Sequence, residues 1–411
     1  MNHAPSTQKM KAVALAEWNW MGHHPTYFYK LLLGFRASGV RVLALCPAAA
    51  AAEITEKIAA LENAETILAG VEFAPIRMVH ERQRLPECLR GRDHGRRMFG
   101  QIAKQVRNWE SRTGMAISLV FFNTIYDYQF ENFRFAQGVF RCRWSGIYLH
   151  ARAFRLPGTV VPYINRLPCP EKIFTLPTLS SVCVIDEGAV KPMENLSGGK
   201  PVFEFPDITD TALEPEDGQG SLAAKLRAFA HGRKIVVCLG HLQKTKGLLE
   251  LCRAANDPVL RDVCFFFGGE VSWSDMERSE INTILRTWEK CPNVLTHLAR
   301  LSDAVINALM LASDVVFAAY TNFPNSSNIM TKAAAFSRPI VVSDGFLMAE
   351  RVEMYGTGKI VPEGDVSAIT LAICDLLRWG APNPLGYAAY FEKHSERTLS
   401  QVLARVIESS K

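Results

Sequence analysis

The sequence has no long run of uncharged apolar residues, and this absence excludes one class of protein. No stretch approaches the roughly eighteen such residues that a membrane-spanning helix needs. The amino-terminal segment has only a short apolar stretch after Lys11 and no small-residue cleavage site, so it resembles a first strand more than a secretory signal. We therefore expect a cytoplasmic protein without a membrane span.

The cysteines form no metal-binding or redox motif. None of the ten belongs to a CxxC pair or to a Cys/His cluster with metal-ligand spacing. Several lie in apolar, strand-like runs such as VVCLG and VCFFF, where a reduced cysteine behaves as a small apolar side chain. The sequence therefore predicts reduced thiols and no metal site, as expected in the cytoplasm.

The chain also lacks an extreme charge. Its 46 Lys and Arg residues and 41 Asp and Glu residues give a formal net charge of +5 and a pI near 8.6. This modest excess favours anionic ligands or surfaces, and we expect no nucleic-acid partner. With 48% hydrophobic and 21% charged residues over 411 positions, the composition is that of a globular protein long enough for two domains.

Short apolar runs alternate with helix-forming segments along the chain. In 314–345, DVVFAA reads as a strand, NFPNSSN as a turn-rich loop, IMTKAAAF as a helix and RPIVVSD as a second strand. The same alternation follows Lys11 and resumes at KIVVCLG. It predicts the α/β class, with two Rossmann-like doubly wound parallel-sheet domains facing across a cleft.

An acidic stretch rich in Pro and Gly, ITDTALEPEDGQG, separates the two halves and has no periodicity. We therefore expect an amino-terminal domain at 1–206, a linker at 207–232 and a carboxy-terminal domain at 233–385. A last helical segment in 386–411 follows the second sheet and is free to pack back on the first domain.

Polar residues stand where the helix of 314–345 begins. Ser326, Ser327 and Asn328 precede its apolar part, so backbone N–H groups and the positive end of the helix dipole face the carboxyl edge of the sheet. An anion can bind there, and a helix cap without a ligand is the alternative.

A second polar loop follows KIVVCLG. In GHLQKTKG, Gly240 allows a tight turn, and Lys244 and Lys246 come just before the next helix. These lysines can neutralise a phosphate, although a Gly and a Lys near a helix start also occur by chance.

The segment Arg90–Arg112 is predicted to be a long basic helix. Its apolar residues recur at three- and four-residue steps beside a cationic face. This pattern predicts either peripheral contact of 90–112 with an anionic membrane surface or an ordinary core helix with a solvated outer face.

Together these motifs resemble the GT-B glycosyltransferases, in particular the family 4 (group 1) type that uses nucleotide-diphosphate sugars. The resemblance spans most of the chain. It is carried by GHHPTYFYKLLLGFRASGVRVLALCP, GHLQKTKGLLELCRAA, FFFGGE, NVLTHLA, LMLASDVVFAAY, SSNIMTKAAAFSRPIVVSD and IVPEGDVSAITLAICDLL.

The resemblance assigns donor-binding roles in the second half. Lys246 matches the lysine that holds the donor pyrophosphate, and His241 stands where these enzymes usually have Arg. Asn325 and the amides of 326–328 suit a diphosphate. The implied co-substrate is a nucleotide-diphosphate sugar, with no other cofactor and no metal.

In the first half, the resemblance places Gly22 and His23 in the loop over the donor phosphate and acceptor. It also makes His150 a candidate for a cleft histidine. Each histidine has a structural side chain as its alternative.

Acidic residues after strand-like runs are candidates for the general base that deprotonates the acceptor. Asp127, Glu187 and Glu17 each follow such a run in the first half.

The chain departs from the family where members usually carry two glutamates eight residues apart. Counted back from Pro339, these positions are Pro324 and Lys332. Lys332 can bind phosphate or pair with a neighbouring acid.

The function that this resemblance implies is transfer of a sugar to a hydroxyl acceptor, a glycan or lipid-linked glycan, in polysaccharide or glycoconjugate synthesis. The missing glutamates leave two alternatives: an inactive GT-B scaffold that serves as a binding or assembly subunit, and a nucleotide-sugar epimerase.

Overall fold

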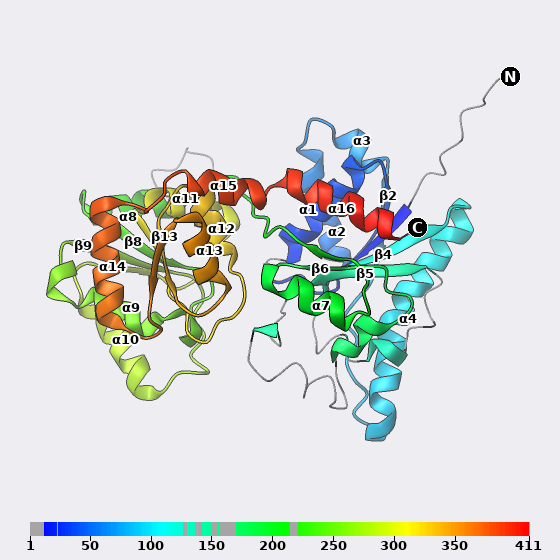
Figure 1. Cartoon of the computed structure of the whole chain (residues 1–411), viewed down its shortest axis with the longest axis horizontal. Coiled ribbons are helices and arrows are strands. Elements are labelled where there is room, and N and C mark those ends of the chain that lie inside the picture. Colours follow the sequence, from blue (N-terminus) through cyan, green and yellow to red (C-terminus); the bar gives the residue numbers. More distant parts are fainter. Residues whose placement is uncertain are drawn as a thin grey trace. The chain divides into compact units, whose positions relative to one another are not determined.

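The chain consists of two compact units. The computed structural model describes residues 12–22, 24–125, 130, 132–135, 138, 142–149, 154–155, 170–213 and 221–410. Unit 1 comprises Met1–Pro206 and Glu396–Lys411, and unit 2 comprises Asp207–Ser395 (Figure 1). The segment expected as one last helix is therefore divided between the two units.

Unit 1 is built on a parallel sheet of seven strands in the order β3-β2-β1-β4-β5-β6-β7. Apolar runs such as AVALA in β1 are wholly buried because helices cover both faces of such a sheet. The strands are β1 (Ala12–Ala16), β2 (Arg41–Cys46), β3 (Val71–Pro75), β4 (Ile117–Ile125), β5 (Arg143–Tyr148), β6 (Val182–Val184) and β7 (Val202–Glu204).

The last helix of the chain belongs to unit 1. It packs against α1 (Figure 1), and the contact is so close that a Cβ on Gly34 would lie 2.6 Å from a side-chain carbon of Leu403. Among the described residues of unit 1, the helices are α1 (His24–Ala37), α2 (Ala48–Ala59), α3 (Ala64–Leu68), α4 (Glu87–Thr113), α7 (Val190–Leu196) and α16 (Glu396–Ser409).

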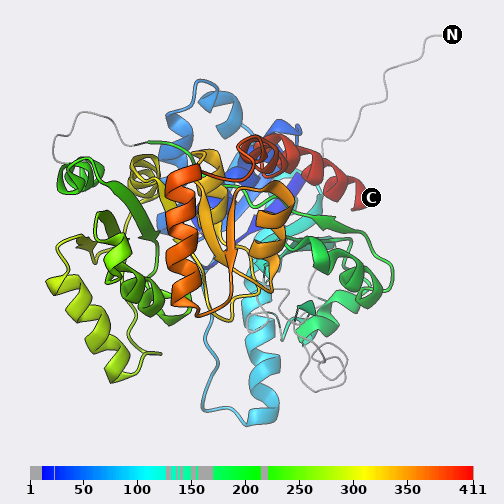
Figure 2. The same cartoon turned by 60° about the vertical axis from the view of Figure 1, so that its left-hand side comes forward.

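Helix α4 is the predicted basic helix, and its apolar stripe lies in the core. Met98, Phe99, Ile102, Val106 and Trp109 are all buried. For this stripe the structure therefore shows the core alternative. Its apolar side chains are buried in unit 1 and are not exposed to a membrane. Figure 2 shows the amino-terminal half of α4, in light blue, extending beyond the sheet of unit 1.

Unit 2 contains a parallel sheet of six strands in the order β10-β9-β8-β11-β12-β13. The order reverses direction at β8 and β11, the two central strands, which is where open α/β sheets bind ligands. The strands are β8 (Lys234–Leu239), β9 (Val263–Gly268), β10 (Val294–His297), β11 (Val315–Ala318), β12 (Ile340–Ser343) and β13 (Gly358–Val361).

Helices flank this sheet on both sides, and α14 lies across one face of it (Figure 2). The helices are α8 (Leu222–Ala230), α9 (Leu248–Ala255), α10 (Arg278–Lys290), α11 (Asp303–Ala312), α12 (Asn328–Ala335), α13 (Leu347–Tyr355), α14 (Val366–Trp379) and α15 (Gly386–Lys393). The predicted strand, helix and strand of 314–345 are β11, α12 and β12. Two parallel sheets with flanking helices confirm the predicted α/β class.

The stretch expected as a linker is not uniform. It contains helix α8, which begins after Ser221. Ser221 caps the first turn by accepting from the amide of Ala224, and the apolar side chains of the helix pack into the core of unit 2. At the other end, α15 and α16 are separated at His394 and Ser395.

Within the described part of the chain, no helix is both long and apolar enough to cross a membrane.

Candidate functional site

The candidate site lies at the carboxyl edge of the unit 2 sheet, after β8 and β11. Gly240 directly follows β8 with φ at +96°, a conformation that favours glycine. A Cβ on Gly269, after β9, would lie 1.7 Å from the carbonyl oxygen of Gly240. The two loops can therefore approach each other this closely only because position 269 is glycine, whereas Gly240 is favoured by its backbone conformation.

The loop that carries Lys246 packs against the loop after β11. Residues Lys244–Lys246 form a 3-10 turn that ends at Gly247, with φ at +65°. A Cβ on Gly247 would lie 2.3 Å from the carbonyl oxygen of Ala319, and the amide of Thr321 donates to the carbonyl of Thr245 at 2.9 Å. The two segments expected to share a site are thus neighbours in the fold.

Tyr320 joins the side chains of these two loops. The Lys246 Nζ donates to the Tyr320 hydroxyl at 2.7 Å and lies 4.2 Å from the centre of its ring. The same hydroxyl is 3.3 Å from Ser327 Oγ. Lys246 is therefore linked through Tyr320 to Ser327, the residue directly before α12.

The amino end of α12 has the features of an anion site. Ser327 is its N-cap, and no side chain of the cap accepts from the first-turn amides. Backbone N–H groups and the positive end of the helix dipole are therefore directed to the same edge of the sheet as Lys246.

The side chains of Ser326 and Asn328 are engaged elsewhere. Both donate to the carboxylate of Asp207, and Asn328 also donates to the carbonyl of Ile208 at 2.9 Å and accepts from Thr209 Oγ1 at 2.8 Å. At these two positions the side chains are therefore occupied by contacts within the protein, and the backbone amides are the groups left to bind an anion.

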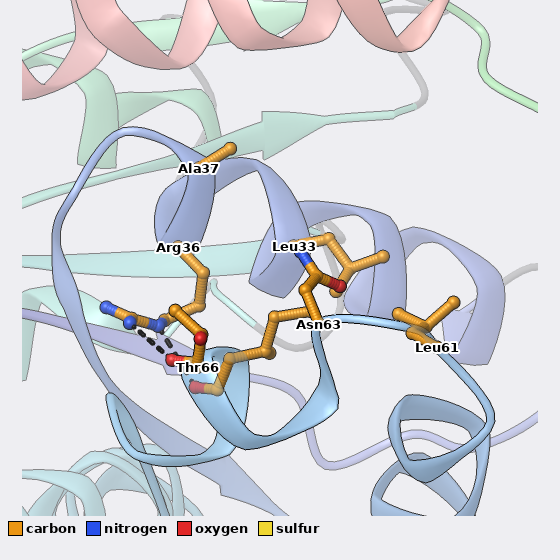
Figure 3. A pocket seen from close by; sticks show the side chains of 7 residues that line it. Leu33, Arg36, Ala37, Leu61, Asn63 and Thr66 are labelled. Atoms are coloured by element: carbon orange, nitrogen blue, oxygen red, sulfur yellow. Dashed lines mark hydrogen bonds between the residues drawn. The ribbon is translucent and has the colours of Figure 1, made fainter.

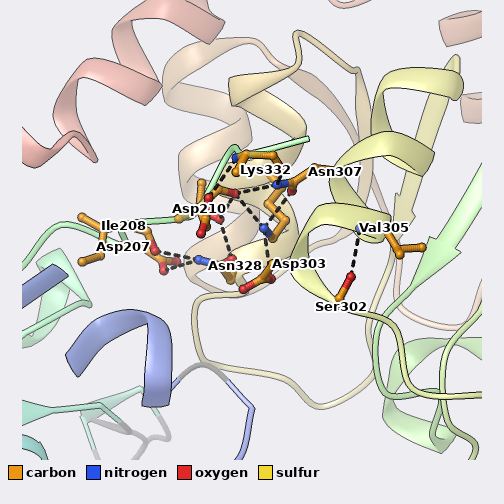
Figure 4. Close-up of polar contacts among 11 residues, drawn as sticks. Asp207, Ile208, Asp210, Ser302, Asp303, Val305, Asn307, Asn328 and Lys332 are labelled. Carbon is orange, nitrogen blue, oxygen red and sulfur yellow. Dashed lines mark hydrogen bonds and ion pairs between the residues drawn. The ribbon is translucent and has the colours of Figure 1, made fainter. Parts of the chain in front are cut away.

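Lys332 is buried on the side of α12 that faces residues 207–210, the segment that also binds Ser326 and Asn328 (Figure 4). Its Nζ donates to Asn307 Oδ1 at 2.8 Å and to the carbonyl of Asp210 at 2.9 Å, and it forms an ion pair with Asp303 at 3.2 Å. Burial lowers its pKa, while Asp303 and Asp210 oppose that shift. Of the two roles left open, pairing with an acid is the one that the structure shows.

The remaining predicted donor ligands vary in their surroundings. Lys244 is exposed and pairs with Glu280 of α10 at 2.9 Å, and this contact is the main cause of its raised pKa. His241 is exposed in the turn after β8, and Asn325 is half-buried before α12. All of them belong to the loops at the same edge of the sheet.

The three predicted catalytic residues, His23, Asp127 and His150, lie outside the described residues. Gly22 is exposed in the turn before α1 with φ at +60°. Glu187 begins a short 3-10 turn after β6.

Glu17, the other acid considered for unit 1, is enclosed by hydrogen-bond donors. It is 2% exposed and accepts from His24 Nδ1 at 2.5 Å, Asn123 Nδ2 at 2.9 Å and the amide of Asn19 at 2.8 Å. Asn19 Nδ2 in turn lies 3.2 Å from His24 Nε2. This carboxylate is therefore buried with its hydrogen bonds satisfied inside the protein, and it is not exposed to an acceptor.

Sequence reasoning missed Tyr320 and Asp207. Tyr320 directly follows the predicted strand DVVFAA, so its place at the sheet edge was available as a signal. Asp207 binds residues 119 and 121 positions further along the chain, and no local pattern shows such a contact.

A separate hollow of about 340 Å³ lies in unit 1 beside Arg36 (Figure 3). The guanidinium donates to the carbonyls of Ile67, Val40 and Thr66, so its donors already have partners. Burial, with help from the nearby Arg41, lowers the pKa of Arg36. This arginine holds the turn before β3 and is not arranged as an anion ligand.

Comparison with known proteins identifies the second half of the chain. Residues 233–378 match the family described as "Glycosyl transferases group 1". No curated protein sequence matches the chain.

Solved structures resemble the whole chain at low sequence identity. A sucrose-phosphate synthase from Thermosynechococcus elongatus has 15% identity and a TM-score of 0.65, over 97% of this chain and 98% of its own. HepE of Anabaena, in complex with UDP and glucose, has 16% identity and a TM-score of 0.62, over 97% and 100%. WaaG, a glycosyltransferase involved in lipopolysaccharide biosynthesis, has 11% identity and a TM-score of 0.57, over 97% and 99%.

These likenesses confirm the GT-B resemblance. The chain has the GT-B fold, and the family match for group 1 glycosyl transferases lies within its second half, at residues 233–378.

Proposed function

We propose that this protein transfers a sugar from a nucleotide-diphosphate sugar to a hydroxyl group of an acceptor. Unit 2 binds the diphosphate of the donor at Lys246 and the amino end of α12. The observation that carries the proposal is the link between Lys246 Nζ, the Tyr320 hydroxyl and Ser327, which brings a cation and a helix amino end to one edge of the sheet.

This arrangement suits the charge that develops during such a reaction. When the bond between the sugar and the diphosphate breaks, negative charge accumulates on the leaving diphosphate. A fixed ammonium and oriented backbone amides stabilise that charge without having to reorganise, which is usually the largest single contribution to catalysis. Lys246 and the first-turn amides of α12 supply these groups in the proposal.

The donor and acceptor classes follow from the resemblance and from the relatives. HepE is described in complex with UDP-glucose, so UDP-sugars are the first donors to test. WaaG acts in lipopolysaccharide biosynthesis, which favours a glycan or lipid-linked glycan as acceptor. We propose a cytoplasmic role in polysaccharide or glycoconjugate synthesis, with the acceptor assigned to unit 1.

Replacing Lys246 by Ala tests the proposal. We expect turnover of the best donor to fall at least about a hundredfold, because a charge contact to the leaving group is lost. The measurement is release of UDP, GDP or ADP from a panel of nucleotide sugars in the presence of glycan acceptors. Lys225→Ala is the control, because Lys225 is an exposed lysine of α8 in the same unit.

Turnover of Lys246→Ala at the level of the unchanged protein would refute the assignment. A fall of the same size in Lys225→Ala would show a general effect of removing positive charge.

A binding subunit without transferase activity is the second candidate function. It is favoured by Pro324 and Lys332 at the positions where relatives usually carry glutamate, and by the engagement of the Lys332 ammonium with Asp303. Titration calorimetry with UDP-, GDP- and ADP-sugars separates the candidates, because failure to bind any donor favours the scaffold. Product analysis without an acceptor detects the remaining alternative, an epimerase.

A further inference from the structure

We infer that Tyr320 is a positioning residue of the diphosphate site, acting through Lys246 and Ser327. The inference deepens the proposed function and rests on it. It starts from two polar groups on two different loops, Lys246 Nζ and Ser327 Oγ, that meet at one phenol oxygen.

The ring of Tyr320 is held firmly by its surroundings. Tyr320 follows β11 by two residues and is only 3% exposed. Its ring meets Phe323 edge to face, with 5.1 Å between ring centres and 87° between planes. Its amide donates to the carbonyl of Ala318 at 2.8 Å. The hydroxyl oxygen therefore has a nearly fixed position at the edge of the sheet.

Lys246 is a long side chain that the tyrosine immobilises. A free lysine side chain samples many rotamers, and ordering one on binding has a cost in conformational entropy. Here the Nζ is fixed by the hydroxyl at 2.7 Å and by the ring, whose centre is 4.2 Å away. The backbone under it is fixed as well, since the Lys246 amide donates to the carbonyl of Gln243 at 2.9 Å. Much of the ordering is complete before a ligand arrives.

The donors of this group remain suited to an anion. An ammonium has three N–H donors, and Tyr320 takes one of them. The phenol accepts that hydrogen bond and shares a second one with Ser327 Oγ. Tyr320 thus sets the spacing between the lysine charge and the amino end of α12.

The opposite role would be competition, in which the tyrosine holds Lys246 away from the ligand. The two roles predict opposite changes when the hydroxyl is removed. Positioning predicts weaker binding of a diphosphate to Tyr320→Phe, and competition predicts tighter binding.

The test uses the full chain and titration calorimetry with two probes, inorganic pyrophosphate and UDP. We expect Tyr320→Phe to bind both roughly tenfold more weakly, which is the usual size for losing a hydrogen bond to a charged group. Tyr355→Phe is the matched control, because Tyr355 is a half-buried tyrosine of the same unit that packs edge to face on Tyr390. It should bind as the unchanged protein does.

A double-mutant cycle separates positioning from a general structural effect. If Tyr320 acts through Lys246, the change Tyr320→Phe should cause little further loss in a Lys246→Met background. Full additivity of the two changes would overturn the inference, and so would unchanged or tighter binding by Tyr320→Phe. Donor KM should rise in Tyr320→Phe more than kcat falls, since the groups that contact the leaving diphosphate are still present.

The outcomes distinguish this inference from the proposed function. If the unchanged protein binds neither pyrophosphate nor UDP, GDP or ADP, the proposed function fails and the inference fails with it. If it binds them and Tyr320→Phe binds them equally well, only the inference fails. Ser327→Ala is a second variant, for which we expect a smaller loss of roughly threefold because its contact is longer and uncharged.

Discussion

The carboxyl edges of the two sheets carry polar clusters of opposite character. In unit 1, Glu17 is a buried carboxylate enclosed by donors from His24, Asn123 and the backbone. In unit 2, the cation Lys246 is only half-buried, and one of its three donors goes to Tyr320. The same kind of strand end thus supports two different purposes. The first cluster is closed by internal hydrogen bonds, whereas the second is the one to which we assign the diphosphate of the donor.

The strongest test of this comparison is Glu17→Ala. Removing the carboxylate takes one hydrogen bond each from the buried His24 Nδ1 and Asn123 Nδ2, so we expect a loss of about 3–5 kcal/mol in the free energy of unfolding. Equilibrium unfolding in urea measures it, with Glu62→Ala, an exposed glutamate of unit 1, as the control. Binding of pyrophosphate by the folded protein should not change. A stable Glu17→Ala protein that had lost this binding would reverse the comparison.

The next largest effect is expected for Lys332→Ala. This buried ammonium donates to Asn307 Oδ1 and to the carbonyl of Asp210. Without it, Asn307 Oδ1 would lose this donor, while the Asp210 carbonyl would keep the hydrogen bond from Asn307 Nδ2 at 3.0 Å. We expect unfolding to become easier by about 2–3 kcal/mol. Because Lys332 is on the face of α12 turned toward Asp303 and not toward Tyr320, pyrophosphate affinity should change much less than in Lys246→Ala. Equal losses of affinity in the two variants would contradict the view that Lys332 stabilises the fold while Lys246 binds the ligand.

The pH dependence of stability gives a third test. Burial, followed by Arg351 and Lys393, lowers the pKa of His394 well below 6.5, so the folded protein holds this ring neutral. The unfolded chain takes up a proton below pH 6.5 while the folded protein does not. Stability from this group is therefore complete above pH 6.5 and decreases as pH falls, by up to about 1.4 kcal/mol per pH unit.

His394→Gln should reduce that slope, as measured by urea unfolding at several pH values between 5 and 7.5. An unchanged slope would show that other groups cause the loss of stability in acid.

The smallest effect is expected for Lys244→Ala. Its ion pair with Glu280 is exposed, and such pairs contribute little. The melting temperature should stay within measurement error. A clear loss of pyrophosphate affinity in this variant would extend the binding cluster beyond Lys246 and sharpen its boundary.

The sequence patterns predict the architecture well, because buried parallel strands and the helices between them leave strong periodic signals. The β11, α12 and β12 unit and the basic helix α4 are examples. Helix α13 and strand β13 are not among the predicted elements. The strand has four residues and includes a glycine and a lysine, so its apolar signal is too short.

The site is predicted only where its residues follow strands of one sheet. Lys246 and Ser327 both stand at such positions, and their proximity through Tyr320 follows from that topology. The engagement of Ser326 and Asn328 by Asp207 could not be predicted, because the partners are more than a hundred positions apart and compete with a ligand for the same donors.

The two ends of unit 2 meet in space. The amide of Asp207 donates to His394 Nδ1 at 2.9 Å, although the two residues are 187 positions apart. Unit 2 is one continuous segment, 207–395, whose two ends are close together. It is therefore a candidate for separate expression or for circular permutation. Unit 1 is interrupted by that fragment, and its recombinant version would need a short tether from Pro206 to Glu396.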